Sequence, residues 1–426
     1  MIDPKMLRED PDALRAAARE KNVTVDVDAL VALDVRRREL RGEFEACRAK
    51  QKRAGEGIAK ASGDEKQGLI AAMKEVADRV KELSAALEEV QAELDAGLAL
   101  VPNPPLTEVP RGASEEDNVV LRCVPEVVPE LPFEPRDYMD IAALCLLIDV
   151  ERAGKVSGTR FGYILRELAL MEFAVVRYAL EKLSSEGFVP AVPPVMIREE
   201  AMAAMGYMAR GAEEIYRTQD DLFLVGTSEQ SMGPFHMDEM LDASELPLRY
   251  CAFSTCFRRE AGSYGRDTRG ILRVHQFDKV EMFVFCKPDQ SRDEHKLLLR
   301  MEEDLVRGLG IPYRVLDICT ADLGDPAAAK FDVECWMPGQ GAYRETHSTS
   351  NCTDYQARSL GVRYRPQAQA SPEYVHTLNG TAFAVGRILI AILENYQRED
   401  GGVTVPEALR PHMGGLASIE PRVTVA

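Results

Sequence analysis

A cluster of charged residues, FRREAGSYGRDTRG, occupies positions 257 to 270 between two apolar runs. It holds four arginines, two acids and three glycines, whereas the chain as a whole has a net charge of −18. Bulk charge therefore does not account for the cluster, and we expect its cations to have a local task.

The apolar runs on both sides of the cluster predict two strands of a hairpin, CAFSTCFRRE and ILRVHQFDKVE, with a long glycine-bearing loop. Side chains alternate between the faces of a strand, so Arg258 shares a face with Glu260. On the second strand Arg273, Phe277 and Glu281 share a face. Such a face is suited to a ligand that has an anion, a planar base and an amine. The alternative is a surface hairpin with ion pairs.

The elements around this hairpin predict an α+β domain from about residue 115 onward. LRELALMEFAVVRYALEKLSSEGF and AFAVGRILIAILENYQ have helical spacing, and the first of them ends at Gly187. Between them lie short apolar runs bounded by Gly, Asp or Pro, namely DLFLVGT, LRYCAFSTCFR, LRVHQFDKVEMFVFC and YRVLDICT. These runs predict an antiparallel sheet, and their irregular alternation with helices disfavours a doubly wound fold.

Residues 28 to 100 contain two heptad patterns, separated by SGDE and ended by VPNPP. They predict an antiparallel helical hairpin, hereafter the arm, whose two apolar stripes face each other. Only Arg37 interrupts the first stripe. The stripes consist of Leu33, Leu40, Phe44, Cys47, Gln51, Ala54, Ile58 and Ala61, and of Leu69, Met73, Val76, Val80, Leu83, Leu87, Val90 and Leu94.

The first helix of the arm is basic although the chain is acidic. Residues 36 to 60 contain nine Lys or Arg and four Glu, a surplus of five cations. This surplus favours a face that follows a phosphate backbone. A dimerisation coil or a spacer with a solvated surface is the alternative.

Composition excludes several classes of protein. The nine cysteines are scattered without a CxxC, which argues against a disulfide framework and a zinc ribbon. The N-terminus MIDPKMLREDPD lacks the apolar core of a signal peptide, and no apolar run is long enough to span a bilayer. We therefore expect a cytoplasmic protein with no membrane partner.

The motifs together resemble those of the seryl-tRNA synthetases, which are class II aminoacyl-tRNA synthetases, over nearly the whole chain. FRREAGSYGRDTRG through KVE resembles motif 2 of the class, LNGTAFAVGRILIAILENYQ resembles motif 3, and ALMEFAVVRYALEKLSSEGFVPAVPP stands where motif 1 is expected. LVGTSE, YRETHSTSNCTDYQAR and VPEALRPHMGG resemble serine-type marks.

The resemblance implies a class II antiparallel sheet flanked by helices, in a homodimer built on motif 1. It implies ATP-dependent activation of L-serine as seryl-adenylate and transfer of the seryl group to the 3′ end of serine tRNA. Residues 1–108 would form a tRNA-binding domain that includes the arm, and residues 109–426 would form the catalytic domain.

The resemblance also implies roles for individual residues. Arg258, Glu345 and Arg387 would be catalytic, and Arg258 would bridge the serine carboxylate and the α-phosphate. ATP would contact Arg258, Arg259, Glu260, Val274, Phe277, Glu345, Thr346, His347, Ser348 and Arg387. Serine would contact Thr227, Ser228, Glu229, Arg258, Glu281, Asn379 and Thr381. The tRNA would contact Arg36, Arg37, Arg41, Arg48, Lys52 and Arg53. Glu345 and Ser348 would hold Mg²⁺ with ATP, and no zinc is expected.

Three positions depart from the family pattern. Ser228 stands where Ala is frequent, Ala321 replaces a common glycine, and His412 occupies the place of a usual Tyr. Two other functions therefore stay open, a seryl-activating paralogue in a specialised or resistance pathway and a non-catalytic tRNA-binding relative. The intact charged residues of the site disfavour the relative, and the basic arm disfavours a paralogue that serves a carrier protein.

Overall fold

The computed structural model describes residues 1–58, 62–261 and 269–423. The chain divides into two compact units, Met1–Pro104 and Pro105–Ala426. Within the described ranges, no helix combines the length and the apolar composition that crossing a bilayer requires.

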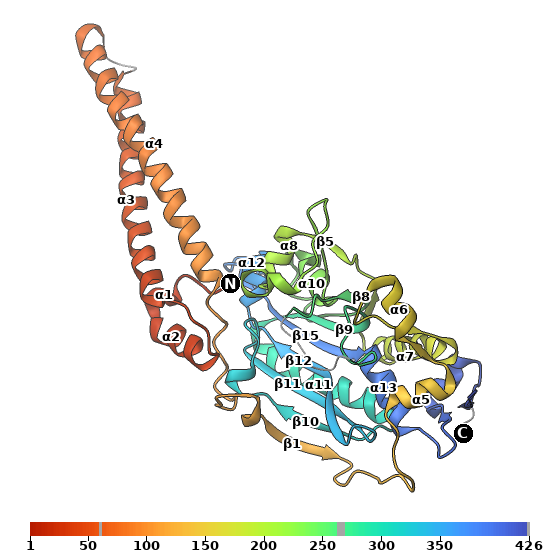
Figure 1. Ribbon diagram of the computed structural model, residues 1–426. Coiled ribbons are helices and arrows are strands. Elements are labelled where there is room, and N and C mark those ends of the chain that lie inside the picture. Colours follow the sequence, from red (N-terminus) through yellow and green to blue (C-terminus); the bar gives the residue numbers. More distant parts are fainter. Residues whose placement is uncertain (59–61, 262–268, 424–426) are drawn as a thin grey trace. The chain divides into compact units, whose positions relative to one another are not determined.

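The first unit consists of two short helices, α1 (Met6–Glu9) and α2 (Pro11–Glu20), and two long ones, α3 (Val27–Ile58) and α4 (Gly63–Ala99), which pack along each other (Figure 1). The predicted helical hairpin is thus confirmed, although the predicted turn at 59–61 lies outside the described residues. Every described side chain of the two predicted stripes is buried or half-buried. The side chains of Ile58, Ala61 and Leu69 are outside the described set.

Arg37 interrupts the stripe without a buried unpaired charge. Its guanidinium donates to the Asp34 carboxylate at 2.7 Å and to Gln91 of the opposite helix at 3.2 Å. Arg38 also donates to Asp34, at 3.1 Å, and Asp34 is fully buried. Buried carboxylates need such partners, so this cluster ties the two helices together near their base.

The second unit is built on an eight-stranded sheet with the order β1-β10-β11-β12-β15-β9-β8-β4. All neighbouring pairs are antiparallel except β4 with β8. The predicted sheet is confirmed. Its strands are β1 (Val119–Val124), β4 (Val189–Ala191), β8 (Leu248–Phe257), β9 (Gln276–Cys286), β10 (Tyr313–Asp317), β11 (Ala329–Met337), β12 (Ala342–Asn351) and β15 (His376–Ala384).

Three helices, α7 (Arg166–Ser185), α11 (Ser291–Gly308) and α13 (Val385–Asn395), pack on one face of this sheet (Figure 1). Helix α7 is followed by Gly187, whose φ of +88° favours glycine. Strand residues alternate between this covered face and the opposite, polar face. The covered face includes Val280, Met282, Val284, Leu378 and Ala382 in the main core, and the polar face includes Lys279, Glu281, Asn379 and Thr381.

Shorter elements surround the sheet. The small sheets contain β2 (Ile148–Asp149) with β3 (Tyr163–Ile164), β5 (Met196–Arg198) with β6 (Leu222–Leu224), β7 (Met240–Leu241) with β13 (Arg363–Tyr364) and β14 (Glu373–Tyr374), and β16 (Val403–Thr404) with β17 (Ser418–Ile419). The remaining α-helices are α5 (Tyr138–Cys145), α6 (Val150–Ser157), α8 (Glu199–Ala204), α9 (Met208–Gly211), α10 (Glu229–Met232) and α12 (Tyr355–Leu360).

The predicted hairpin is correct in pairing but too long. β8 ends at Phe257 and pairs with β9, which begins at Gln276, so Phe277 and Glu281 do share a strand. Arg258 and Arg273 lie outside both strands, and Glu260 has a φ of +51°. Alternation therefore does not orient these three side chains. The loop residues 262–268 lie outside the described part of the chain.

Candidate active site

A cleft with two adjoining compartments lies on the polar face of the sheet. The inner compartment has a volume of about 530 Å³ and the outer one about 290 Å³. Both are lined by Arg258, Glu260, Arg273, Lys279, Glu345 and Thr381. The inner compartment adds Tyr207, Gly226, Thr227, Glu229, Glu281, Ser348, Ser350 and Asn379, among others, and the outer one adds Leu272, Val274, Phe277, Thr346 and Arg387.

Glu229 is a buried carboxylate of the inner compartment. It accepts hydrogen bonds from Tyr207 at 2.9 Å, Gln356 at 2.8 Å and Asn379 at 3.0 Å, all neutral donors. Burial, together with the negative charge of nearby Glu281, raises the pKa of Glu229. A cationic group of a ligand at this position would therefore stabilise the ionised carboxylate of Glu229.

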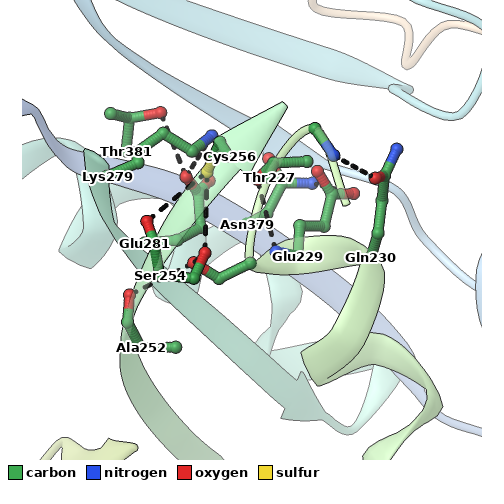
Figure 2. A network of polar contacts seen from close by, with 12 residues as sticks. Thr227, Glu229, Gln230, Ala252, Ser254, Cys256, Lys279, Glu281, Asn379 and Thr381 are labelled. Atoms are coloured by element: carbon green, nitrogen blue, oxygen red, sulfur yellow. Dashed lines mark hydrogen bonds and ion pairs between the residues drawn. The ribbon is translucent and has the colours of Figure 1, made fainter. Parts of the chain in front are cut away.

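Glu281 lies beside Glu229 and already has a cation. Figure 2 shows the Lys279 ammonium paired with its carboxylate, and the Thr381 hydroxyl donates to the same oxygen at 3.3 Å. The side chains of Lys279 and Glu281 are only 9% and 2% exposed. Sequence reasoning missed Lys279, although a lysine two residues before a glutamate in the apolar strand QFDKVEMFVFC was a visible signal.

Arg258 stands where the two compartments meet. Its Nε donates to the Gly226 carbonyl at 3.1 Å, and its guanidinium lies 5.3 Å from the centre of the Phe277 ring. A hydrogen bond of 3.0 Å from its backbone N–H to the His275 carbonyl fixes the chain at this point. The side chain can therefore reach an anion on either side.

The outer compartment is bordered by two ion pairs. Arg273 pairs with Glu260, and Arg387 donates to the Glu345 carbonyl at 2.7 Å and lies 3.4 Å from its carboxylate. Burial opposes ionisation of Glu345, but the positive charges of Arg387, Lys330 and Arg258 outweigh it and lower the pKa of this carboxyl group. Glu345 is thus held ionised at the junction.

The structure gathers most of the predicted site residues around this cleft. From the strands β9, β12 and β15, the helices α10 and α13 and the segments between them it brings together Thr227, Glu229, Arg258, Glu260, Val274, Phe277, Glu281, Glu345, Thr346, Ser348, Asn379, Thr381 and Arg387.

Three predicted site residues, described next, do not line either compartment. Ser228 is fully buried, and its hydroxyl bonds to Ser254 at 2.9 Å and to the Ala252 carbonyl at 3.3 Å. His347 is buried on the other face of β12, where burial lowers the pKa of its imidazole to about 3. Arg259 is exposed outside the cleft lining.

Of the six predicted tRNA contacts, Arg37 differs from the rest. Its side chain is 15% exposed and pairs with Asp34, so it has little surface to offer a phosphate. The others are exposed, namely Arg36, Arg41, Arg48, Lys52 and Arg53.

The three departures from the family pattern cause little disturbance. Ala321 lies in a short 3₁₀ turn and does not have a positive φ, so a methyl group is tolerated there. The imidazole of His412 lies 3.7 Å from the Glu181 carboxylate on α7. The added hydroxyl of Ser228 is satisfied within the sheet, as described above.

Comparison with known families identifies both units. Residues 1–105 match the seryl-tRNA synthetase N-terminal domain, and residues 213–396 match the tRNA synthetase class II core domain of the G, H, P, S and T enzymes.

Full-length relatives agree. The serine-tRNA ligase of Acidothermus cellulolyticus is 49% identical over 416 residues, which cover 97% of this chain and 98% of that protein. The crystal structure of seryl-tRNA synthetase from Pyrococcus horikoshii complexed with ATP superimposes with a TM-score of 0.92 at 38% identity, covering 99% of this chain and 100% of that one. The cytoplasmic serine-tRNA ligase from Naegleria fowleri, in complex with AMP, gives a TM-score of 0.87 at 34% identity, with 99% of both chains covered. This chain belongs to the seryl-tRNA synthetase family.

Proposed function

We propose that this protein activates L-serine with ATP and transfers the seryl group to the 3′ end of serine tRNA, acting as a homodimer in the cytoplasm. One observation carries the proposal. Arg258 stands between an inner compartment with two buried carboxylates and an outer compartment with an aromatic ring, which suits an amino acid on one side and a nucleotide on the other. Membership of the seryl-tRNA synthetase family supports the same reaction.

In this proposal serine occupies the inner compartment. Its ammonium lies against Glu229 and Glu281, its carboxylate meets Arg258, and its hydroxyl reaches Asn379 and Thr381. Alanine would leave the polar groups that bond this hydroxyl unpaired. The site should therefore favour serine over alanine by a factor of about 10⁴. We expect threonine to be rejected by size, through the methyl group that it carries beside the hydroxyl.

ATP occupies the outer compartment. The adenine stacks on Phe277, with the Val274 backbone and Glu260 at its edge, and Arg387 covers the opposite side.

The chain fits a magnesium ion only together with the nucleotide. Among the described residues no group of three or more His, Cys, Asp or Glu side chains is arranged to hold a metal. Glu345 and Ser348 would hold Mg²⁺ with the phosphate oxygens, because this hard ion takes one or two carboxylates and substrate phosphates. When bound, it would neutralise phosphate charge.

The chemistry then needs positioning and positive charge. A serine carboxylate oxygen attacks the α-phosphorus, the bond to the pyrophosphate oxygen breaks, and pyrophosphate leaves with the negative charge. Arg258 lies where charge develops on the non-bridging oxygens, as expected of a preorganised donor. A terminal ribose hydroxyl of tRNA then attacks the seryl carbonyl and displaces AMP.

The remaining surfaces fit the other partners. The five exposed residues among the predicted tRNA contacts on α3 would contact the tRNA. Residues 1–108 would then act as the tRNA-binding domain and residues 109–426 as the catalytic domain. The exposed apolar side chains Leu170 and Phe173 of α7, 57% and 67% exposed, support a homodimer that covers this helix.

The test is serine-dependent exchange of labelled pyrophosphate into ATP, followed by charging of serine tRNA. We expect both activities. Absence of exchange would leave a non-catalytic relative, and exchange without charging would leave a seryl-activating enzyme with another acceptor.

A further inference from the structure

Lys279 is a buried lysine inside the proposed serine site, and it borders both compartments whereas its partner Glu281 borders only the inner one. We propose that Lys279 is exchanged for the substrate. In the empty site its ammonium occupies Glu281 where the ammonium of serine will lie. When serine binds, Lys279 moves to the outer side and contacts the serine carboxylate and the α-phosphate. This inference rests on the proposed function.

The geometry shows that one oxygen of the Glu281 carboxylate is already paired. The Lys279 ammonium pairs with Oε2 of Glu281, and Thr381 donates to the same oxygen at 3.3 Å. Both charged side chains are at least nine-tenths buried. A second ammonium at this oxygen would lie beside the first, and like charges at such a distance repel strongly away from bulk water. Serine and Lys279 therefore compete for one place.

The outer side offers Lys279 somewhere to go. The flexible stem of a lysine can carry its ammonium between neighbouring anions, which the shorter, hydrogen-bonded Glu281 cannot do. Its side chain already lines the outer compartment together with Arg258 and Glu345. Serine and ATP bring new anions to this side as serine arrives, so Lys279 exchanges one counter-ion for others.

The exchange keeps the charge of the inner compartment constant. Glu229 is bonded by neutral donors, and its raised pKa reflects burial and the charge of Glu281. If Lys279 stayed, the ammonium of serine would have to compete with it. If Lys279 leaves, the ammonium of serine replaces it, so that Glu281 has one cation throughout. Lys279 then becomes a second cation beside Arg258, where negative charge develops during adenylation.

The test compares the parent with Lys279→Met, which keeps the shape of the stem and removes the charge. We expect serine affinity, measured by calorimetry without ATP, to be equal or higher because the competitor is gone. The rate of pyrophosphate exchange at saturating substrates should fall about 10²-fold, the scale for loss of a transition-state cation. The thermal midpoint of the variant is measured as the folding check.

Two results would overturn the inference. Serine affinity more than threefold weaker would mean that Lys279 merely holds Glu281 in place, and an unchanged exchange rate would mean that it does not reach the phosphate. Both differ from failure of the proposed function, in which the parent itself shows no serine-dependent exchange.

A measurement on the parent avoids any folding defect of the variant. Brief acetylation with acetic anhydride, followed by mass spectrometry, reports the reactivity of Lys279. Serine alone should raise this reactivity because the ammonium leaves its buried pair, and ATP added with serine should suppress it again. Reactivity that does not change with serine would contradict the exchange.

Discussion

The arm and the cleft use charge in opposite ways. On α3 (Val27–Ile58) most of the cations are exposed and distributed along one helix. The cleft instead contains a few charged side chains that are almost completely buried, such as Lys279 and Glu281. Exposed charges interact through solvent, so their effects are individually small, nearly additive and weakened by salt. Buried charges depend on single contacts, so each one is specific and costly to remove. This difference predicts how variants of the two regions will behave.

The largest effect is expected from replacing residues 28 to 100 by a short flexible linker. Pyrophosphate exchange should survive because the cleft and the main core lie in Pro105–Ala426. Charging of tRNA should fall about 10³-fold or more, since the five exposed predicted contacts, at about 1 kcal/mol each, are lost. The kcat/KM for tRNA measures this change.

Point variants of the arm provide the matched control. Arg41→Gln and Arg48→Gln should each reduce the salt dependence of tRNA binding by about one unit of logarithmic slope. Arg37→Gln should leave the slope unchanged and instead destabilise the arm, because Asp34 loses a partner. Charging by the truncated protein at the parent rate would show that the arm is only a spacer or coil.

In the cleft, Arg258→Ala should lower the rate of serine adenylation about 10²-fold or more, the usual cost of losing a transition-state donor. The thermal midpoint should hardly change because the side chain is exposed. Pyrophosphate exchange measures the rate. Arg259→Ala is the control, since this neighbour lies outside both compartments and its loss should leave the exchange rate within threefold of the parent. Adenylation near the parent rate in Arg258→Ala would remove this residue from the mechanism.

Glu281→Gln tests the contact with the substrate ammonium. Losing one partner of a buried charge pair typically costs 2 kcal/mol or more, so the serine KM should rise about 30-fold or more. The ATP KM should stay close to that of the parent. Exchange kinetics with each substrate varied in turn provide both constants. Ser228→Ala serves as the control with unchanged serine KM, and damage to ATP binding alone would mean that the ligands are assigned to the wrong compartments.

The smallest effect tests whether a half-buried carboxylate outside the cleft destabilises the folded state. Glu172 on α7 (Arg166–Ser185) hydrogen-bonds Asp278, and burial together with that acid raises the pKa of Glu172 from 4.5 to about 7. The folded state therefore holds a proton that the unfolded state releases, and stability falls as pH rises from about 4.5 to 7. Glu172→Gln should raise stability at pH 8 by about 1 kcal/mol, the linkage value reduced for partial solvation.

Thermal unfolding at pH 8 and pH 5 measures this gain, which should shrink at the lower pH. The exposed Glu181 on the same helix is the control, because its pKa is lowered through a hydrogen bond from Arg177 and its replacement should bring no gain at pH 8. An equal gain at both values of pH would exclude ionisation of Glu172 as the cause.

The sequence by itself determined the arm and the residue types of the cleft. Heptad spacing shows which residues of each helix face the other helix, because the helical repeat places these positions on one face. Arg258, Glu281 and Arg387 could be named because the motifs that contain them resemble those of a known family.

Only the tertiary structure decided which of these residues meet and which face away. The strand prediction extended to Arg258 and Arg273, yet β8 ends at Phe257 and β9 begins only at Gln276. The backbone of the segment between the strands therefore orients both arginines, and the alternation of side chains along a strand does not. Ser228 and His347 belong to the right motifs but point into the core, because Ser254 on β8 bonds the Ser228 hydroxyl and Phe383 on β15 packs against His347. The pairing of Lys279 with Glu281 inside the cleft became apparent only in the folded structure. Whether a side chain is buried, paired or open to a ligand depends on strands that are distant in sequence, and spacing along one segment does not encode their approach.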